Sequence, residues 1–372
     1  MRILINARFL IPGNVEGIGL YTYEIVRRWV RNHPNHRFVL CLDRNCKPLI
    51  TGPNVEYIVL RPPARHPFLF LWWFEVAIPR VYKQKKCDVF FSPDGFLSLS
   101  GSISKSLLTI HDLAYLHFPD HVGKIMLWYY QRFVPKFVSK ATHIITVSDA
   151  SRKDIIGHFP GSSRKTTTIH NGVRDDLKPL SDEDVKHAQM RFTNGAPYFL
   201  VLGAIHPRKN LLGALRAYSI FRSQSALNVR LLIVGRQAWK SRDVMKEIAQ
   251  HPYQEDIHLL GYIEEPELKE LLGASAGLVY VSFLEGFGFP IVEAMASGVP
   301  VITSDRSSMK EIADDSALLV PPDDPGKIAE AMSLIVSDKH LATQLVEKGL
   351  KRAQAFNWDQ AAEKSFAVLT QL

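Results

Sequence analysis

The sequence contains little cysteine and no long apolar run. Only three cysteines occur among its 372 residues, Cys41, Cys46 and Cys87. Their odd number and their spacing fit neither a disulfide framework nor a zinc site, so we expect a protein of the reducing cytoplasm. No apolar stretch approaches the length of a membrane span. The short apolar run at residues 2 to 6 leads directly into a polar loop, which predicts a first strand and not a signal peptide.

Paired carboxylates in the position of metal ligands are also missing. The acidic clusters at residues 182–184, 314–315 and 323–324 each fall in a linker or at a helix boundary. Acidic caps and solvated faces are the normal explanation for such clusters. None of them directly follows an apolar strand, where a metal-binding pair is expected. We therefore expect no essential divalent metal and no cofactor other than the substrates.

The positive charge is distributed unevenly along the chain. The net charge is +8, but residues 1–172 hold 23 Lys and Arg against 11 Asp and Glu, or +12. The remaining residues hold 22 against 26, or −4. A basic half of this kind commonly binds nucleic acid or an anionic membrane surface. The charge alone does not choose between these partners.

Short aliphatic and β-branched runs alternate with helix-length segments along most of the chain. This alternation predicts an α/β fold with parallel sheets and crossover helices, and 372 residues suit two such domains. A polar, charged and proline-containing segment, residues 174–184, is the predicted link. We expect two Rossmann-like doubly wound domains whose sheets present their carboxyl ends to a common cleft. The predicted strands are 2–6, 37–43, 55–60, 87–91, 106–110, 143–147 and 166–170, then 198–203, 228–234, 257–261, 277–281, 299–303 and 316–320.

The most informative motif is Glu-Gly-Phe-Gly-Phe-Pro-Ile-Val-Glu at residues 285–293. Two glycines and a proline after Glu285 predict a loop there, with Pro290 at the first helical position and Glu293 in the first helical turn. A carboxylate, a glycine-rich backbone and a helix N-terminus would then converge, which suits a sugar hydroxyl and a phosphate. An ordinary loop that enters a helix is the alternative.

A second motif places two cations between a strand and a helix. It reads Leu-Gly-Ala-Ile-His-Pro-Arg-Lys-Asn at residues 202–210. The forked guanidinium of Arg208 beside the ammonium of Lys209 can neutralise a diphosphate without a metal. A solvated turn would explain the segment equally well by itself. Its combination with the 285–293 motif in one domain favours a site for a nucleotide diphosphate.

The first half has weaker signals at the ends of its predicted strands. Gly17 and Gly19 lie between a strand and a helix, where they either admit a phosphate or sugar or simply form a tight turn. His111, beside Asp112, is a candidate proton-handling or hydrogen-bonding group. Asn171 and Gly172 are interpreted as a turn near the hinge whose residues tolerate positive φ.

Two segments of the basic half combine aromatic and cationic side chains. One runs from Phe68 to Lys86 and the other from Lys124 to Lys140. Helices of this composition can lie in a membrane interface and are attracted to anionic lipid. Core helices with basic outer faces are the alternative, and the sequence leaves both open.

Taken together, these motifs resemble the family 4 retaining glycosyltransferases, in the branch that contains mannosyltransferases. The resemblance covers nearly the whole chain, and the Glu285 to Glu293 element is its most specific part. It implies the GT-B fold, with an acceptor-binding domain at residues 1–175, a nucleotide-sugar domain at 176–355 and a last helix, 356–372, that packs back on the first domain. The residues that carry it are Gly17, Gly19, His111, Asp112, Ser148, Asn171, Gly172, Gly203, Arg208, Lys209, Asn210, Gly261, Glu285, Glu293, the 298–301 segment and Trp358.

The resemblance also implies roles. Arg208 and Lys209 would bind the diphosphate and stabilise the leaving nucleotide, and Glu293 would bind the ribose. Glu285 would hold donor-sugar hydroxyls and His111 would contact the sugar near its reacting carbon. The remaining donor-binding positions would be Phe287, Gly288 and Ile291, with Gly17 and Gly19 closing over the diphosphate. One departure is Ala204, where many members of the family have an arginine.

The predicted function is transfer of a hexose, with mannose from GDP-mannose favoured, to a glycan or polyprenyl-linked acceptor in polysaccharide or lipopolysaccharide synthesis. A peripheral contact with the anionic inner face of the cytoplasmic membrane is expected, and no nucleic acid. The alternatives are a UDP-sugar-dependent glycosyltransferase, a nucleotide-sugar epimerase, and a basic protein that binds membrane or nucleic acid. The epimerase is disfavoured because this sequence does not place the acidic catalytic residues that such an enzyme needs. The third alternative leaves the 285–293 motif unexplained.

Overall fold

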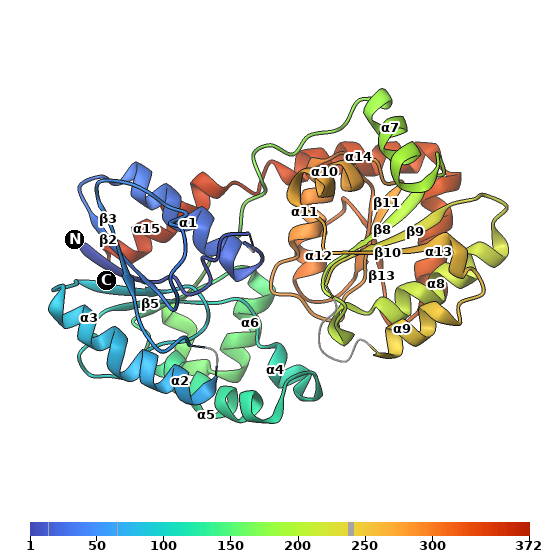
Figure 1. Ribbon diagram of the computed structural model, residues 1–372. Helices are drawn as coiled ribbons and strands as arrows, with labels where there is room; N and C mark the ends of the chain where they lie inside the picture. Colours follow the sequence, from blue (N-terminus) through green and yellow to red (C-terminus); the bar gives the residue numbers. More distant parts are fainter. Residues whose placement is uncertain (14, 65, 237–241) are drawn as a thin grey trace. The chain divides into compact units, whose positions relative to one another are not determined.

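The computed structural model describes residues 1–13, 15–64, 66–236 and 242–372. They form two compact units (Figure 1). One contains residues 1–172 together with 357–372, and the other contains residues 173–356. The expected domain boundaries, 175/176 and 355/356, differ from these by three residues and by one.

The first unit is built on a seven-stranded parallel sheet in the order β3-β2-β1-β4-β5-β6-β7. The strands β1, β4 and β5 are at its centre and almost entirely buried, which explains their largely apolar sequences. The strands are β1 (Arg2–Asn6), β2 (Arg37–Leu42), β3 (Val55–Val59), β4 (Val89–Ser92), β5 (Ser106–Ile110), β6 (His143–Thr146) and β7 (Thr166–Thr168).

Helices cover both faces of this sheet, as they do in doubly wound folds. The crossover helices are α1 (Ile18–Asn32), α2 (Pro67–Trp72), η1 (Trp73–Ala77), α3 (Ile78–Gln84), α4 (Ala114–His117), η2 (Pro119–His121), α5 (Lys124–Lys140), α6 (Asp149–His158) and η3 (Pro160–Lys165), and the last helix of the chain is α15 (Trp358–Thr370). The element η1 is a π-helical segment that joins α2 to α3 without a break.

The second unit has a six-stranded parallel sheet in the order β10-β9-β8-β11-β12-β13. Its strands are β8 (Tyr198–Leu202), β9 (Arg230–Val234), β10 (Ile257–Gly261), β11 (Gly277–Tyr280), β12 (Val301–Ser304) and β13 (Leu318–Val320). Its helices are α7 (Asp182–Thr193), η4 (Pro207–Lys209), α8 (Leu211–Gln224), α9 (Arg242–Ala249), η5 (Gln254–Asp256), α10 (Glu265–Gly273), α11 (Phe289–Ala296), α12 (Ser307–Ala313), α13 (Pro325–Ser337) and α14 (Lys339–Ala353).

Every strand predicted from the sequence is present, and all the pairings are parallel. The predicted α/β class is confirmed. Most strand ends lie within two residues of the expected ones. Within the described residues, no helix combines the length and the apolarity that crossing a bilayer requires.

The last helix, α15, completes the first unit by packing on α1. The indole nitrogen of Trp29 donates a hydrogen bond to the carbonyl of Ala362 at 2.8 Å. The guanidinium of the buried Arg28 pairs with Asp359 at 2.8 Å. Trp358, at the start of α15, is fully buried. Residues more than 300 positions apart in the sequence therefore share one core.

Gly172 permits this packing, but not in the way the sequence suggested. Neither Asn171 nor Gly172 has a positive φ, so the predicted conformational reason for them was wrong. A Cβ atom on Gly172 would instead lie 2.2 Å from the backbone nitrogen of Trp358. The glycine is required by the close approach of α15.

Substitution Gly172→Ala should therefore destabilise the first unit. A clash with backbone cannot be relieved by a side-chain rotation, so we expect the free energy of unfolding to fall by about 1–3 kcal/mol. Thermal unfolding and amide hydrogen exchange of α15 measure the effect. The control is Gly101→Ala, because a Cβ there meets no atom within 4 Å. Equal stability of the two variants would contradict the assignment.

Candidate functional site

The topology of the second sheet brings two of the predicted motifs together. The chain leaves β8 to form β9 on one side and later returns to form β11 on the other side. The loops after β8 and β11 therefore diverge at the carboxyl edge, the usual ligand position in such sheets. Residues 203–210 follow β8, and residues 281–288 follow β11.

Arg208 and Lys209 meet Glu285 at this point. The Arg208 guanidinium is 3.0 Å from one carboxylate oxygen of Glu285, and the Lys209 ammonium is 2.7 Å from the other. Arg208 also donates to the carbonyl of Leu284. Asn210 anchors the cationic turn by donating to the carbonyl of Val281. The structure thus unites three of the four predicted catalytic residues in one cluster.

Glu285 is an ionised carboxylate held by its neighbours. Its side chain is 9% exposed. Burial by itself raises the pKa of a carboxyl group, but Arg208 and Lys209 outweigh that effect and lower the pKa of Glu285 to about 2. The cluster therefore has two positive charges and one negative charge at neutral pH. Its net charge of +1 favours an anionic ligand.

Backbone groups of the 285–288 loop are fixed by α12. The Ser308 hydroxyl donates to the carbonyls of Glu285 and Phe287 at 2.8 and 3.0 Å. Gly288, the residue before α11, has φ +107°, which favours glycine. Phe287 and Ile291 are buried, so their side chains support the loop.

The helix α11 begins at Phe289, and this corrects two expectations. Pro290 occupies the second helical position and not the first, and Glu293 lies beyond the first turn. Glu293 is buried, and Arg174 approaches it at 3.2 Å. Burial is the largest influence on Glu293 and raises its pKa, while Arg174 opposes the change. The two glutamates of the motif thus shift in opposite directions.

His111 belongs to the first unit, where it directly follows β5. Its Nε2 lies 2.8 Å from the carbonyl oxygen of Pro93, so Nε2 carries the proton and Nδ1 is the acceptor in the neutral ring. Burial lowers the pKa of His111. Asp112 accepts a hydrogen bond from the backbone of Ala114, at the start of α4, and does not orient the imidazole.

Gly17 and Gly19 also belong to the first unit, at the start of α1. Gly17 has φ +50° and precedes the helix, and nothing lies within 4 Å of the position of a Cβ. Gly19 is buried in the first turn of α1. Of these two glycines, Gly17 is the one that combines an unusual backbone conformation with open space beside it.

Family models match both halves of the chain. The model described as Glycosyltransferase Family 4 matches residues 15–177, and the model described as Glycosyl transferases group 1 matches residues 182–352. Together they span nearly all of the sequence. The chain belongs to glycosyltransferase family 4.

Relatives of this glycosyltransferase include O-antigen enzymes. O-antigen chain mannosyltransferase B of Escherichia coli is 29% identical over 71% of this chain and 69% of its own length. O-antigen chain mannosyltransferase RfbU of Salmonella typhimurium is 29% identical over 58% of this chain. The match spans only 57% of RfbU.

Solved structures share the fold over the full chain. Sucrose-phosphate synthase of Thermosynechococcus elongatus has a TM-score of 0.80 and 20% identity, with 100% of this chain and 98% of that chain covered. WaaG, a glycosyltransferase involved in lipopolysaccharide biosynthesis, has a TM-score of 0.78 and 15% identity, with both chains covered completely. The predicted GT-B fold is confirmed.

Sequence reasoning did not identify Tyr280, which lies at the end of β11. Its hydroxyl is 2.7 Å from the Lys209 ammonium, and that ammonium also stands 4.9 Å from the centre of the Tyr280 ring. The Lys209 side chain passes Gly203 at van der Waals distance, since a Cβ there would lie 3.6 Å from it. A tyrosine at the end of a strand, directly before the Glu285 loop, was the available signal.

A buried polar cluster in the first unit was also missed. Asp94 accepts from Arg8 at 2.6 Å and from Asn6 at 2.7 Å. The Arg8 guanidinium lies 4.4 Å from the ring centre of Phe96. These residues lie at or just beyond the carboxyl ends of β1 and β4, the equivalent point of the first sheet. They fix the loop whose Pro93 carbonyl holds His111.

One group in the first unit has spacing that a metal ion could use. His117 and His158 both approach the carboxylate of Asp154, at 2.9 and 3.2 Å. Imidazole pairing with a carboxylate explains these contacts without a metal. The group does not include any of the predicted site residues.

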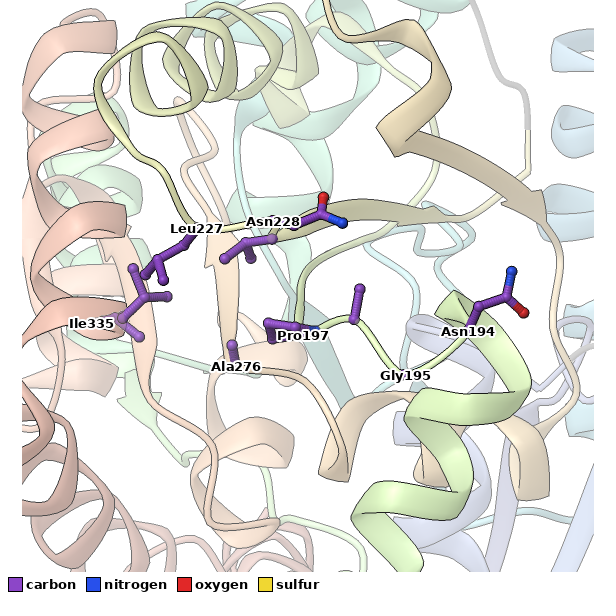
Figure 2. Close-up of a pocket in the computed structure, with 10 residues that line it drawn as sticks. Asn194, Gly195, Pro197, Leu227, Asn228, Ala276 and Ile335 are labelled. Carbon is purple, nitrogen blue, oxygen red and sulfur yellow. The ribbon is translucent and has the colours of Figure 1, made fainter.

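One hollow in the second unit lies away from the site. It has a volume of about 620 Å³ and is lined by Asn194, Pro197, Leu227, Asn228 and Ile335, among others (Figure 2). Pro197 directly precedes β8, and Ala276 directly precedes β11, so the hollow lies at the amino edge of the sheet. None of its ten lining residues is charged, which makes it unsuitable for a diphosphate.

The Glu285 ion pairs make a testable contribution to stability. Because the pKa of Glu285 is lowered from 4.5 to about 2 in the folded protein, the stabilisation is complete above pH 4.5 and is lost as the pH falls toward 2. At pH 7, Glu285→Gln should lower the free energy of unfolding by about 3 kcal/mol. The deficit should shrink over that acidic range.

Thermal unfolding of both proteins from pH 2 to 7 measures this difference. Glu347→Gln is the control, because Glu347 is exposed on α14. If the loss of free energy of unfolding in Glu285→Gln is the same at every pH, the ion pairs do not stabilise the fold.

Proposed function

We propose that this protein is a retaining hexosyltransferase that transfers mannose from GDP-mannose to a glycan or polyprenyl-linked acceptor. The observation that carries the proposal is the cluster of Arg208, Lys209 and Glu285 at the carboxyl edge of the second sheet. The cluster combines an excess of positive charge with a carboxylate that can accept from sugar hydroxyls. The O-antigen mannosyltransferases among the relatives support mannose and lipopolysaccharide-type polysaccharide synthesis.

Departure of the diphosphate is the demanding step of such a transfer. Arg208 and Lys209 would stabilise the negative charge that develops on the leaving phosphate, through fixed positions in a partly buried site. The bond from the anomeric carbon to the phosphate oxygen breaks, and a bond to the acceptor oxygen forms on the same face. The leaving phosphate oxygen would take the acceptor proton. No protein nucleophile is needed.

The remaining residues would position the donor. Glu285 would accept hydrogen bonds from sugar hydroxyls, and Glu293 from the ribose. The backbone at Phe287, Gly288 and Ile291 lies between these carboxylates in the sequence and would complete the donor site. His111 and the Gly17 to Gly19 turn of the first unit would contact the sugar and the diphosphate. Neutral His111 offers Nδ1 as an acceptor.

The donor panel is the first test of this proposal. We expect GDP-mannose to raise the stability of the protein by about 2.7 kcal/mol at a hundredfold excess over its dissociation constant. UDP-glucose is the principal comparison, because HepE of Anabaena was solved with UDP and glucose. A larger response to UDP-glucose would identify UDP-glucose as the donor in place of GDP-mannose. No response to any nucleotide sugar would contradict the proposed function.

Lys209→Ala tests the role of the cations. The variant should lower turnover by roughly two to four orders of magnitude, because a charge partner of the transition state is lost. Turnover is measured in buffer with EDTA, since we propose a site that requires no divalent metal. The matched control is Lys186→Ala, an exposed lysine on α7. Near-normal activity of Lys209→Ala would contradict the assignment.

Two other classes are separated by the same reagents. An epimerase would isomerise the donor sugar without any acceptor. A nucleic-acid-binding protein would bind RNA in a salt-dependent manner and would not respond to nucleotide sugars. Neither an epimerase nor a nucleic-acid-binding protein explains the charge cluster around Glu285.

We further propose that the reaction takes place in the cytoplasm at the inner face of the cytoplasmic membrane. A polyprenyl-linked acceptor is held in the bilayer, so the enzyme must reach a lipid surface. The net charge of +12 on residues 1–172 is suited to anionic lipid.

A further inference from the structure

Exposed apolar side chains gather on two helices of the first unit. Five of the eleven large hydrophobic residues that are exposed in the described part of the chain lie on α2, η1 and α5. On the first two elements these are Phe68, Trp72 and Val76, which are 64%, 40% and 50% exposed. On α5 they are Ile125 and Trp128, 55% and 50% exposed. Exposed aromatic side chains in such a group indicate an interaction surface.

The two helices are in direct contact, so the exposed residues form one surface. Phe70 of α2 and Tyr129 of α5 are buried with their rings 5.7 Å apart. Figure 1 shows α2 and α5 side by side along one edge of the unit. Phe68 and Trp72 lie two residues to either side of Phe70, and Trp128 is adjacent to Tyr129. The apolar groups therefore lie around the buried contact.

The π-helical segment η1 keeps one row of side chains on the outside. Phe68, Trp72, Val76 and Arg80 are spaced four residues apart, and all four are exposed. In an α-helix of 3.6 residues per turn a spacing of four drifts around the axis. The wider turn of a π-helix reduces this drift, and such segments are frequent at functional sites. The row changes from apolar to cationic at Arg80, and Lys83 extends the cationic part.

The outer face of α5 has the same composition. Its exposed positions include Lys124, Arg132 and Lys136, which flank the apolar pair Ile125 and Trp128 along the helix. No acidic residue occurs in α5. On η1, the carboxylate of Glu75 is turned inward and accepts a hydrogen bond from the backbone N–H of Leu99 at 2.8 Å. The surface is therefore aromatic and cationic.

We propose that this surface docks the enzyme on an anionic lipid bilayer. The docking face is defined as Phe68, Trp72, Val76, Arg80 and Lys83 together with Lys124, Ile125, Trp128, Arg132 and Lys136. Aromatic side chains insert at the headgroup level, and lysine and arginine are attracted to acidic headgroups. Its purpose rests on the proposed lipid-linked acceptor, but the surface itself does not depend on which donor is used.

Charge favours lipid over a second copy of the chain. A symmetric dimer through this face would place the same cations opposite one another. Like charges in an interface cost free energy, whereas acidic headgroups neutralise them. A bilayer is thus the occupant that satisfies both the aromatic and the cationic side chains.

Sedimentation of the full-length protein with phosphatidylglycerol-containing vesicles tests the docking face. We expect binding that weakens with salt and is much lower on pure phosphatidylcholine. The triple variant Lys124→Gln, Arg132→Gln, Lys136→Gln should reduce the partition coefficient about a hundredfold, at about fivefold for each charge removed. The control removes the same charge from exposed lysines of the second unit, as Lys186→Gln, Lys339→Gln, Lys351→Gln. It should bind like the wild type.

A second pair of variants tests the aromatic side chains. Trp72→Ser, Trp128→Ser should bind weakly and lose the blue shift of tryptophan fluorescence that vesicles cause. Met190→Ser, Leu227→Ser removes exposed apolar residues of the second unit and should change neither. Equal binding of the wild type to anionic and neutral vesicles would overturn the proposal. An equal loss of binding in the face variants and in their controls would also overturn it. A wild-type dimer that only the face variants dissociate, without vesicle binding, would assign the face to a second copy.

The donor response separates this inference from the proposed function. The face variants should keep the thermal response to nucleotide sugars, because none of the substituted residues is among the proposed donor-binding residues. Donor binding without vesicle binding removes the docking face alone. Vesicle binding without a response to any donor removes the proposed function alone.

Discussion

The pairing of Glu285 with Arg208 and Lys209 is the interaction on which the candidate site depends. Two cations on adjacent residues repel each other, and the carboxylate between them holds both side chains in place. The cluster is therefore ordered before any donor arrives, so less freedom is lost on binding. The same carboxylate leaves an excess of one positive charge. Glu285 thus positions the cations without cancelling their attraction for a diphosphate.

Close backbone packing at the edge of the second sheet makes this cluster possible. A Cβ on Gly235, after β9, would lie 2.0 Å from the carbonyl oxygen of Gly203, after β8. The two loops can touch only because both residues are glycine, and both have positive φ. This contact fixes the start of the turn that carries Arg208 and Lys209. Local backbone chemistry therefore determines the position of charges that act on a ligand.

The sequence predicted the strands well, and the contacts between distant residues poorly. Strands such as β4 and β5 are buried on both faces, so composition alone identifies them. The pairing of Arg208 with Glu285 joins loops far apart in sequence, and its geometry depends on strand order. Gly172 was assigned to a turn, because only the folded chain brings Trp358 against it. The aromatic segments left two alternatives open because buried Phe70 and exposed Phe68 lie on the same helix.

The two units use one topology for different electrostatic purposes. In the first unit, Arg8 and Asp94 lie at the point where the strand order reverses, and their charges cancel. In the second unit, Arg208, Lys209 and Glu285 occupy the equivalent point with a net charge of +1. The first half of the chain is nevertheless the basic one, at +12. Part of that charge is on outer faces such as that of α5, where Lys124, Arg132 and Lys136 are exposed and can attract a surface. The overall charge is thus suited to the anionic surface proposed above, and the local charge at the reversal of strand order is suited to the proposed diphosphate donor.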